Sequence, residues 1–258
     1  MTARERSREG RPVDEVHAYV SRAIPGDDFV HLLDDVERAS LAVIRAPRDR
    51  DRYLSAHVLM RRVLAEHTGI AEDEQRFHRR CIICGGPHGK PRLVPPGVDP
   101  FDENAISALD TPQINLSYAG NRVMLALRQQ GAIGVDIEAW AMTDFVGFPS
   151  VALTAEESRE LLEFGVADRA AARTAWWCRK EAVLKATGHG LRVEAVNLRV
   201  TPPDTPPALL AWNDPTIPRP DVTMADVPVE GRYAAAVAVE GRVTLRVHLH
   251  DVDHLARV

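Results

Sequence analysis

The segment Ile133-Gly134-Val135-Asp136-Ile137-Glu138 alternates β-branched residues with a glycine and two carboxylates. Successive side chains on a strand point to opposite faces, so we expect the β-branched residues on one face and Asp136 and Glu138 on the other. Two neighbouring carboxylates repel each other and are costly to bury without a partner. Their hard oxygen atoms suit Mg²⁺, which commonly takes one or two carboxylates together with phosphate and water. The segment alone leaves two interpretations open, a magnesium-binding strand and a solvent-facing acidic strand.

The residues before this strand predict helices followed by strands. A helical pattern extends over about 34–67 and ends at Gly69, which suits a C-cap. Residues 94–112 are rich in Pro, Asp and Gly and are expected to form a loop. Short apolar stretches at 114–118 and 123–127 predict strands. The close turns between them and the acidic strand favour an antiparallel meander.

The residues after this strand predict two helices and a hairpin. A capping box formed by Thr154 and Glu157 begins one helix, and a longer helix is expected over 168–186. Alternating residues at 233–239 and 243–249 predict a hairpin. Helices and strands thus occur in separate runs, with a helix followed by a small sheet twice, so we expect an α+β fold.

Composition argues against several classes of protein. The chain has 258 residues, of which 45% are hydrophobic and 27% charged, as in ordinary globular proteins. No apolar run approaches the roughly 20 residues that span a bilayer, and the charged stretch 1–12, expected to be disordered, lacks the apolar centre of a signal peptide. A net charge of −5 argues against general nucleic-acid binding. Three cysteines do not make a disulfide framework, so a cytoplasmic protein is expected.

Positive charge is concentrated in one part of the chain. Between Arg38 and Arg92 there are twelve Arg or Lys residues against six Asp or Glu. Such a stripe suits an anionic ligand or an acidic partner, although a solvated basic surface is the simpler explanation for any single arginine. The chain has only three lysines, Lys90, Lys180 and Lys185, against 29 arginines. A lysine is a compact cation that can give up its proton, so these positions are candidates for a site.

Two of these lysines lie on the predicted helix that includes Trp177. Glu181 and Lys185 are four residues apart and share a face, in the order that also favours a plain surface ion pair. Trp177 lies one turn earlier on that face, and a fully solvated face would not usually carry a tryptophan. We therefore expect the face to meet another part of the protein. Lys180 points to a different face.

A glycine-rich turn carries the third lysine and several residues that can bind metals. Lys90 ends this turn and is a candidate phosphate contact, although Gly-Lys-Pro is also an ordinary turn. His78, Cys81, Cys84 and His88 fall within eleven residues. Their spacing is tighter than that of the usual two-knuckle zinc site, so thiols in a turn are favoured over zinc.

Taken together, these segments resemble the Sfp-type 4′-phosphopantetheinyl transferases. The specific signature is Gly134-Val135-Asp136-Ile137-Glu138 followed by Lys180-Glu181-Ala182-Val183-Leu184-Lys185. The other matching segments, in the family's order, are 52–61, 88–91, 115–117, 153–157 and 177–188. The resemblance implies a pseudo-dimer of two similar α+β halves with the active site in the cleft between them. After the stretch 1–12, the N-terminal half (13–130) would bind the nucleotide of coenzyme A, and the C-terminal half (131–258) would carry the metal and catalytic residues.

The resemblance also implies a reaction. A serine of an apo acyl or peptidyl carrier protein would attack the β-phosphorus of coenzyme A, take the 4′-phosphopantetheine arm and release 3′,5′-ADP. Asp136, Glu138 and Glu181 would hold Mg²⁺, with Mn²⁺ as an alternative, and the catalytic residues would be Glu181, Lys185 and Asp136. The residues implied to bind coenzyme A are Arg45, Arg52, Lys90, Pro91, Ser117, Tyr118, Asp136, Glu181 and Lys185. The resemblance also implies that the protein is a monomer and that its partner is an acidic carrier protein of polyketide or nonribosomal peptide biosynthesis.

Departures from the family pattern leave a second function open. Tyr118 stands where the family usually has a histidine that contacts the 3′-phosphate, and tyrosine carries no positive charge. The helix around Ser40 and Val43 lacks basic residues that relatives often carry, with Arg38 and Arg45 as potential replacements. The alternative is a catalytically weakened paralogue that binds coenzyme A or a nucleotide in a regulatory role.

The resemblance ranks the three lysines. Lys185→Arg is expected to damage turnover most, because Lys185 would contact the pyrophosphate. Lys90→Arg should mainly weaken coenzyme A binding, and Lys180→Arg should be the mildest change.

Overall fold

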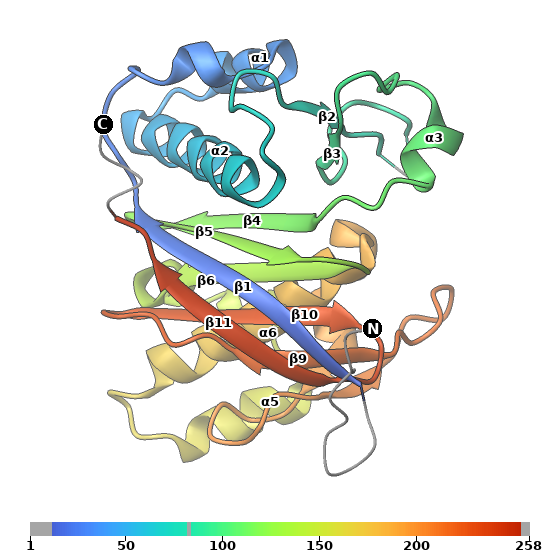
Figure 1. The fold of residues 1–258 in the computed structure, drawn as a ribbon. Helices are drawn as coiled ribbons and strands as arrows, with labels where there is room; N and C mark the ends of the chain where they lie inside the picture. Colours follow the sequence, from blue (N-terminus) through green and yellow to red (C-terminus); the bar gives the residue numbers. More distant parts are fainter. Residues whose placement is uncertain (1–11, 82–83, 254–258) are drawn as a thin grey trace.

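The structure is a computed structural model that describes residues 12–81 and 84–253. Two sheets pack face to face and each has a long helix on its outer face, giving four layers in the order helix, sheet, sheet, helix (Figure 1). The predicted α+β class is confirmed. The stretch 1–12, expected to be disordered, lies outside the described residues except for Pro12, whose carbonyl accepts a hydrogen bond from Thr244 N. Within the described ranges, no helix is long and apolar enough to cross a membrane.

The first sheet has the strand order β11-β1-β5-β4. Its strands are β1 (Val13–Arg22), β4 (Gln113–Ala119), β5 (Arg122–Arg128) and β11 (Thr244–Asp251). Helices α1 (Asp35–Val43) and α2 (Pro47–Thr68) form the outer layer, and α2 ends at Gly69, whose φ of 73° is the left-handed conformation of a C-cap. Met60 and Leu64 of α2 share a buried cluster with Leu125 of β5.

The second sheet has the strand order β6-β10-β9. Its strands are β6 (Ile133–Ala139), β9 (Val222–Asp226) and β10 (Tyr233–Glu240), and α6 (Arg169–Thr187) covers it. The shorter elements are the helices α3 (Glu103–Ser107), α4 (Phe148–Ala152) and α5 (Ala155–Glu160), the strand pairs β2 (Arg76–His78) with β3 (Arg92–Val94) and β7 (Leu198–Val200) with β8 (Leu209–Trp212), and 3-10 turns at Val30–Leu32, Trp140–Thr143, Leu161–Glu163, Gly190–Arg192 and Ala195–Asn197.

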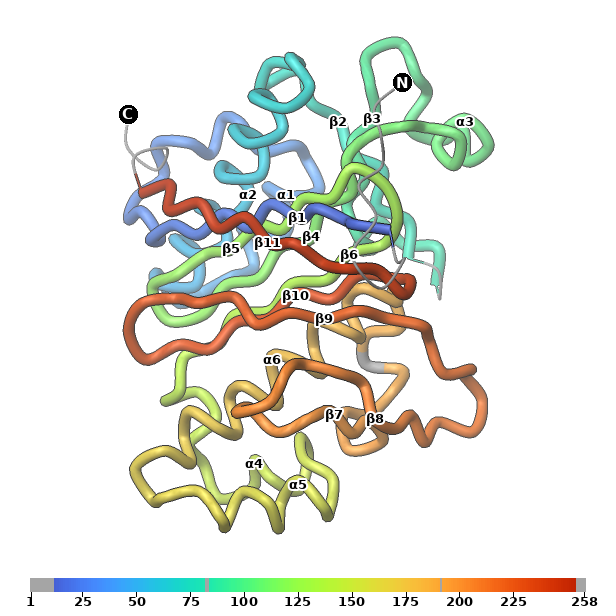
Figure 2. The backbone as a smooth tube through the Cα atoms, turned by 60° about the horizontal axis from the view of Figure 1, so that its bottom comes forward, coloured from blue at the N-terminus to red at the C-terminus, as the bar shows by residue number. Residues whose placement is uncertain are grey.

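The hairpin predicted near the C-terminal end is wrong. β10 pairs with β6 on one side and with β9 on the other, so neither of its edges is left for β11. β11 instead runs parallel to β1, with Val247 opposite Val16, and Figure 2 shows the two strands side by side. β1 itself lies outside every predicted strand.

The predicted meander is right for β4 and β5 and wrong for β6. β4 and β5 pair as an antiparallel hairpin, whereas β6 belongs to the second sheet. Side chains join β4 to β6 in place of a ladder: Val135 N donates to Asn115 Oδ1 at 2.8 Å, and Ile137 N donates to Ser117 Oγ at 3.3 Å. The loop expected over 94–112 also contains the short helix α3.

The alternation of β6 determines which of its side chains enters which layer. Ile133, Val135 and Ile137 are fully buried between the sheets, in one cluster with residues of β1 and β5. The opposite face of the strand therefore points towards α6. Asp136 on that face is 3% exposed, which excludes a solvent-facing acidic strand for this residue.

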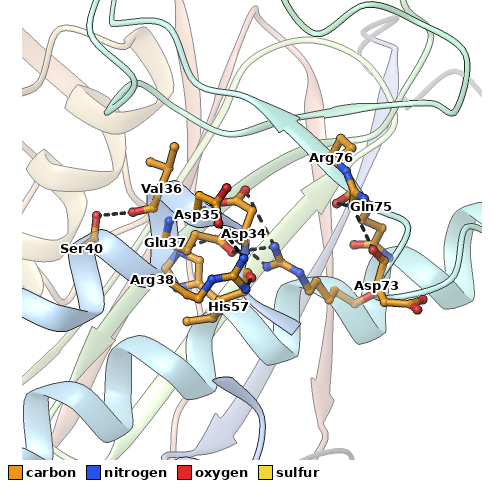
Figure 3. Close-up of polar contacts among 12 residues, drawn as sticks. Asp34, Asp35, Val36, Glu37, Arg38, Ser40, His57, Asp73, Gln75 and Arg76 are labelled. Atoms are coloured by element: carbon orange, nitrogen blue, oxygen red, sulfur yellow. Dashed lines mark hydrogen bonds and ion pairs between the residues drawn. The ribbon is translucent and has the colours of Figure 1, made fainter. Parts of the chain in front are cut away.

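A buried carboxylate ties α1 to α2. Asp34 and Glu37 form a capping box at the start of α1. Glu37 is 1% exposed, accepts a hydrogen bond from Arg61 Nη2 of α2 at 2.5 Å and pairs also with Arg79. Figure 3 shows Glu37 between Asp34 and His57. Two guanidinium groups thus neutralise a carboxylate that water barely reaches.

Candidate functional site

β6 and α6 approach each other closely where the site is built. A Cβ atom on Gly134 would lie 2.1 Å from Ala182 O and 2.4 Å from Ala186 N. Only a glycine allows the helix backbone this near to the strand. Because of this approach, Asp136 of the strand meets Lys185 of the helix.

Asp136 and Lys185 form a partly buried ion pair at this contact. Asp136 Oδ1 accepts hydrogen bonds from Lys185 Nζ at 2.7 Å and from Ser117 Oγ at 2.8 Å. Lys185 Nζ also donates to Val135 O at 3.1 Å. Burial on its own lowers the pKa of Lys185, but the Asp136 carboxylate outweighs it and the pKa is raised. Lys185 is therefore held as a cation.

Glu138 and Glu181 are the two other carboxylates at this place. Burial, and then repulsion by Asp136, raise the pKa of Glu138 to about 7. The same two causes in the same order raise the pKa of Glu181 to about 7. Both causes penalise a negative charge, so a nearby cation would favour the charged form of each group.

The three carboxylates make a donor set that fits a divalent cation. Asp136 Oδ2 is buried and has no hydrogen-bond partner among the residues described. A bound cation would satisfy this oxygen and offset the penalty on Glu138 and Glu181. In the part of the chain that the structure describes, the one group of three potential ligands with all atoms within 4.8 Å of one another lies elsewhere, between β2 and β3. The carboxylates would therefore have to draw closer together around an ion.

Lys180 has a structural role that sequence alone did not indicate. It is fully buried, and its Nζ donates to Glu157 Oε2 at 2.5 Å, Ala152 O at 2.7 Å and Ala195 O at 3.0 Å. Glu157 in turn caps α5 and accepts a hydrogen bond from Val200 N at 3.0 Å. An arginine would bring a longer, forked cation into this closed site. The ranking of Lys180→Arg as the mildest change for the activity stays a prediction, and the closed site adds the expectation that this change lowers stability.

A cleft of about 1220 Å³ lies beside the carboxylates, between loops around β2 and β3 and the end of α6. Lys90, Pro91 and Lys185 line it, whereas Asp136, Glu138 and Glu181 are not among its lining residues. Lys90 Nζ donates to Ile133 O. Burial, and then the positive charge of Arg128, lower the pKa of Lys90 to about 8. The cleft thus presents two lysines to an anionic ligand.

The other predicted coenzyme A residues are brought together only in part. Burial raises the pKa of Tyr118, while Arg52 and Lys185 oppose this, so Tyr118 lies within electrostatic reach of both cations. Arg52 also pairs with Asp49. Arg45 is exposed between α1 and α2, and no hydrogen bond or ion pair joins it to another described residue.

Comparison with known proteins finds a family match in the second part of the chain. Residues 132–238, which contain the contact between β6 and α6, match the model of the 4′-phosphopantetheinyl transferase superfamily.

This match confirms the resemblance to the 4′-phosphopantetheinyl transferases over residues 132–238 of the chain. The chain is 26% identical over 238 residues to the 4′-phosphopantetheinyl transferase HetI of Nostoc sp., a match that covers 88% of this chain and 89% of that protein. It is 28% identical over 169 residues to a protein of Synechocystis sp. whose provisional name is that of a 4′-phosphopantetheinyl transferase. That match covers 65% of this chain and spans 61% of the Synechocystis protein.

Two solved holo-(acyl-carrier-protein) synthases show a partial likeness. The crystal structure from Bacillus anthracis, in complex with coenzyme A (3′,5′-ADP), has a TM-score of 0.37 and 21% identity, covering 43% of this chain and 96% of that one. The structure from Thermotoga maritima has a TM-score of 0.33 and 19% identity, covering 43% of this chain and 64% of that one. Neither score indicates a shared overall fold.

The superfamily match covers one part of the predicted site. It includes Asp136, Glu138, Glu181 and Lys185, whereas the coenzyme A residues predicted in the first half all precede residue 132. Among the latter, Ser117 is 7% exposed and its hydroxyl is engaged with Asp136 and Ile137 N. A direct contact between Ser117 and coenzyme A would have to displace one of these bonds.

One residue that shapes this site was missed in the sequence. Asn115 fixes β4 to β6, and its signal is a polar amide between the apolar residues Ile114 and Leu116. Cys178 lies beneath the carboxylates, where burial, and then the charges of Asp136 and Glu138, raise the pKa of its thiol well above its usual range. Its thiol donates to Ala234 O at 3.2 Å, so Cys178 is a packing residue.

Proposed function

We propose that this protein transfers the 4′-phosphopantetheine arm of coenzyme A to a serine of an apo acyl or peptidyl carrier protein, releasing 3′,5′-ADP in a Mg²⁺-dependent reaction. The observation that carries the proposal is the meeting of Asp136 and Lys185 beside two carboxyl groups with pKa values of about 7. This arrangement occurs within the matched range of the superfamily. It supplies an acceptor for a proton and a cation for a phosphate at one end of a cleft.

The proposed step divides its work among these side chains. The serine oxygen forms a bond to the β-phosphorus of coenzyme A while the bond from that phosphorus to the bridging oxygen breaks, and the electron pair leaves with 3′,5′-ADP. Glu181, or a water bound to the Mg²⁺ beside it, would accept the serine proton. Lys185 donates hydrogen bonds to the pyrophosphate and stabilises the leaving group. Mg²⁺ held by Asp136, Glu138 and Glu181 would neutralise the charge that builds on the phosphate oxygens.

Coenzyme A is proposed to lie in the cleft of about 1220 Å³. Lys90, Pro91 and Lys185 line this cleft, and Tyr118 lies within electrostatic reach of Lys185 and of Arg52. Arg45 stays a predicted contact with no structural support. An acidic carrier would meet the excess of basic residues between Arg38 and Arg92.

The division of the chain into two similar halves, 13–130 and 131–258, belongs to the same proposal. It is supported by the strand orders β1-β5-β4 and β6-β10-β9, in which β5 lies between β1 and β4 as β10 lies between β6 and β9. The division is not clean at the C-terminal end, because β11 pairs with β1.

A second candidate function is favoured by Tyr118. A neutral hydroxyl at the position where the family usually has a histidine suits a weakened paralogue that binds coenzyme A or a nucleotide without transferring the arm. Such a protein would bind coenzyme A in calorimetry and leave carrier proteins unchanged.

Intact-mass spectrometry separates the two functions. The protein is incubated with apo carrier proteins of both kinds, coenzyme A and Mg²⁺, and each carrier is weighed before and after. A gain equal to one phosphopantetheine group, lost in Glu181→Gln, is the expected result. If no carrier gains mass while coenzyme A still binds, the regulatory function replaces the transferase.

A further inference from the structure

The loop between β2 and β3 gathers three residues of the kind that bind transition metals. Cys81, Cys84 and His88 each offer one ligand atom, and these atoms all lie within 4.8 Å of one another. Cys84 Sγ and His88 Nε2 are 2.9 Å apart. None of the three takes part in the transfer chemistry proposed above, so the cluster needs its own explanation.

The backbone of this loop is folded around the cluster. Gly85 N donates to Cys81 O at 2.9 Å, and Cys81 N donates to Gly86 O at 2.8 Å. Gly86 N also points at Cys84 Sγ at 3.4 Å. A Cβ atom on Gly86 would lie 3.1 Å from His88 Cδ2 and 3.3 Å from Cys84 Sγ, so a side chain there would crowd two of the ligands. Amide donors to a sulfur stabilise its thiolate form, which is the form that binds a metal.

We propose that Cys81, Cys84 and His88 bind one Zn²⁺ ion. Two thiolates and one imidazole are a soft donor set that selects zinc over magnesium or calcium. Zn–S bonds of about 2.3 Å and Zn–N bonds of about 2.0 Å at tetrahedral angles place ligand atoms roughly 3.5–3.8 Å apart. The observed separations below 4.8 Å fit this, with a small opening of the contact between Cys84 and His88. Binding releases the two thiol protons, and His88 binds as a neutral ring through Nε2.

The fourth position of the zinc ion is assigned to water at the cleft. Cys81, Cys84 and His88 are all among the residues that line the cleft of about 1220 Å³. His78 lines it as well, but its Nδ1 is held by Pro100 O at 2.9 Å and the ring is not part of the ligand group. Of the four residues singled out in the sequence, the structure thus brings three together.

The ion would fix the loop that leads to Lys90. Gly89 N donates to Arg79 O at 2.8 Å, so the two arms of the loop are tied just before Lys90. Closing the same loop with a metal removes conformational freedom between these arms. The consequence for coenzyme A binding rests on the proposed function, whereas zinc binding itself does not.

The test measures metal content and needs neither coenzyme A nor a carrier. The untagged protein is produced with zinc in the medium, freed of loose metal by desalting, and assayed by inductively coupled plasma mass spectrometry. One zinc per chain is expected. Cys84→Ser and His88→Asn should lose it, and both residues are exposed, so neither change opens the core. The matched controls Cys178→Ala and His78→Asn should keep one zinc.

A second measurement guards against indirect effects of the substitutions. Replacement of zinc by Co²⁺ should give the visible bands of a tetrahedral ion with thiolate ligands, absent from Cys84→Ser. Zinc far below one per chain in the wild-type protein, with no Co²⁺ spectrum, would overturn the site. Loss of zinc from His78→Asn would overturn the assignment of water to the fourth position. A Cys81–Cys84 disulfide in the protein as isolated would replace the metal site by a redox pair.

Discussion

Two buried glutamates, Glu37 and Glu157, serve the two halves of the molecule in the same way. Each is the last residue of a capping box at the start of a short helix, α1 or α5. Each pairs with a basic residue of the following long helix: Arg61 of α2, 24 residues later, and Lys180 of α6, 23 residues later. The sequence alone showed no repeat of this kind, because the residues between the paired positions differ.

The two long helices also correspond in the positions that follow these paired residues. Gly69 follows Arg61 by eight positions and Gly188 follows Lys180 by eight, and both glycines end their helix in the left-handed conformation. The residue after each basic partner is half-buried: Arg62 in α2 and Glu181 in α6.

The difference between the helices lies in the charges that follow. Positions 62 and 66 carry Arg and Glu, whereas positions 181 and 185 carry Glu and Lys. Only the second arrangement faces a strand carboxylate, since Lys185 meets Asp136. On the proposed division into two similar halves, one scaffold would serve twice, and the proposed chemistry would depend on a reversal of charge at these two positions.

The strongest test of this difference between α2 and α6 compares the variants Glu181→Gln and Arg62→Gln. On the proposed function, Glu181→Gln should lower kcat/KM for the carrier about 10²–10⁴-fold, because it removes a proton acceptor. Arg62→Gln alters the corresponding position of α2 and should leave the rate nearly unchanged. Initial rates of carrier modification measure both, with circular dichroism as the check on folding. Equal losses in the two variants would mean that the helices do not differ in function.

The buried pairs should differ in stability. Lys180→Met leaves Glu157 without a cation and should lower the free energy of unfolding by about 3–5 kcal/mol. Arg79→Met leaves Glu37 paired with Arg61, so a loss of no more than about 1–3 kcal/mol is expected. Urea unfolding at pH 7 gives both values. A larger loss in Arg79→Met would show that the two glutamates are not held in comparable ways.

The carboxylates of the second half should make Mg²⁺ binding depend on pH. The pKa values of Glu138 and Glu181, about 7, exceed the ordinary 4.5. The folded state therefore binds more protons than the unfolded state between about pH 4.5 and 7, and without Mg²⁺ stability falls as pH rises through this window.

Mg²⁺ must displace these protons below pH 7 and need not do so above it. Its affinity should weaken up to roughly tenfold per pH unit below 7 for each proton displaced. Thermal melts with and without Mg²⁺ at pH 6 and pH 8 should show the larger stabilisation at pH 8. The double variant of Glu138→Gln with Glu181→Gln should show none at either pH, and a persistent Mg²⁺ effect there would place the ion elsewhere.

The smallest effect is expected from a change of Tyr118. It tests whether the first half of the chain contributes only to the binding of coenzyme A. Tyr118→His would add a partial positive charge beside Arg52 and should lower KM for coenzyme A by less than about tenfold, with kcat unchanged. Tyr118→Phe, which removes only the hydroxyl, is the matched control and should raise KM slightly. An unchanged KM in Tyr118→His would exclude this residue from the coenzyme A site.

Local features of the fold could be predicted from the sequence, and long-range pairing could not. The capping box at Thr154 and the stop at Gly188 follow from the chemistry of a few adjacent residues. The partner of β11 depends on β10 having both edges filled, which is decided by β9, a strand that was not predicted. Turn spacing around 128–133 likewise gives no sign that β6 starts a new sheet.

The same limit applies to the site. The alternation in β6 correctly placed Asp136 and Glu138 opposite the β-branched face, because side-chain alternation is local. The contact between Asp136 and Lys185 required the family resemblance, since it depends on the close approach at Gly134. The buried role of Lys180 was not predicted, because its three acceptors come from α4, from α5 and from the 3-10 turn Ala195–Asn197.

The pairing of β11 with β1 has a consequence for synthesis on the ribosome. Arg246 bonds to Glu15 at 3.0 Å, and the two residues are 231 positions apart. While the chain is being made, the outer edge of β1 stays without its partner until β11 has emerged. Contacts of such sequence separation slow folding, and an open strand edge invites association with other chains. Nascent copies of this protein should therefore depend on chaperones until synthesis reaches the last strand.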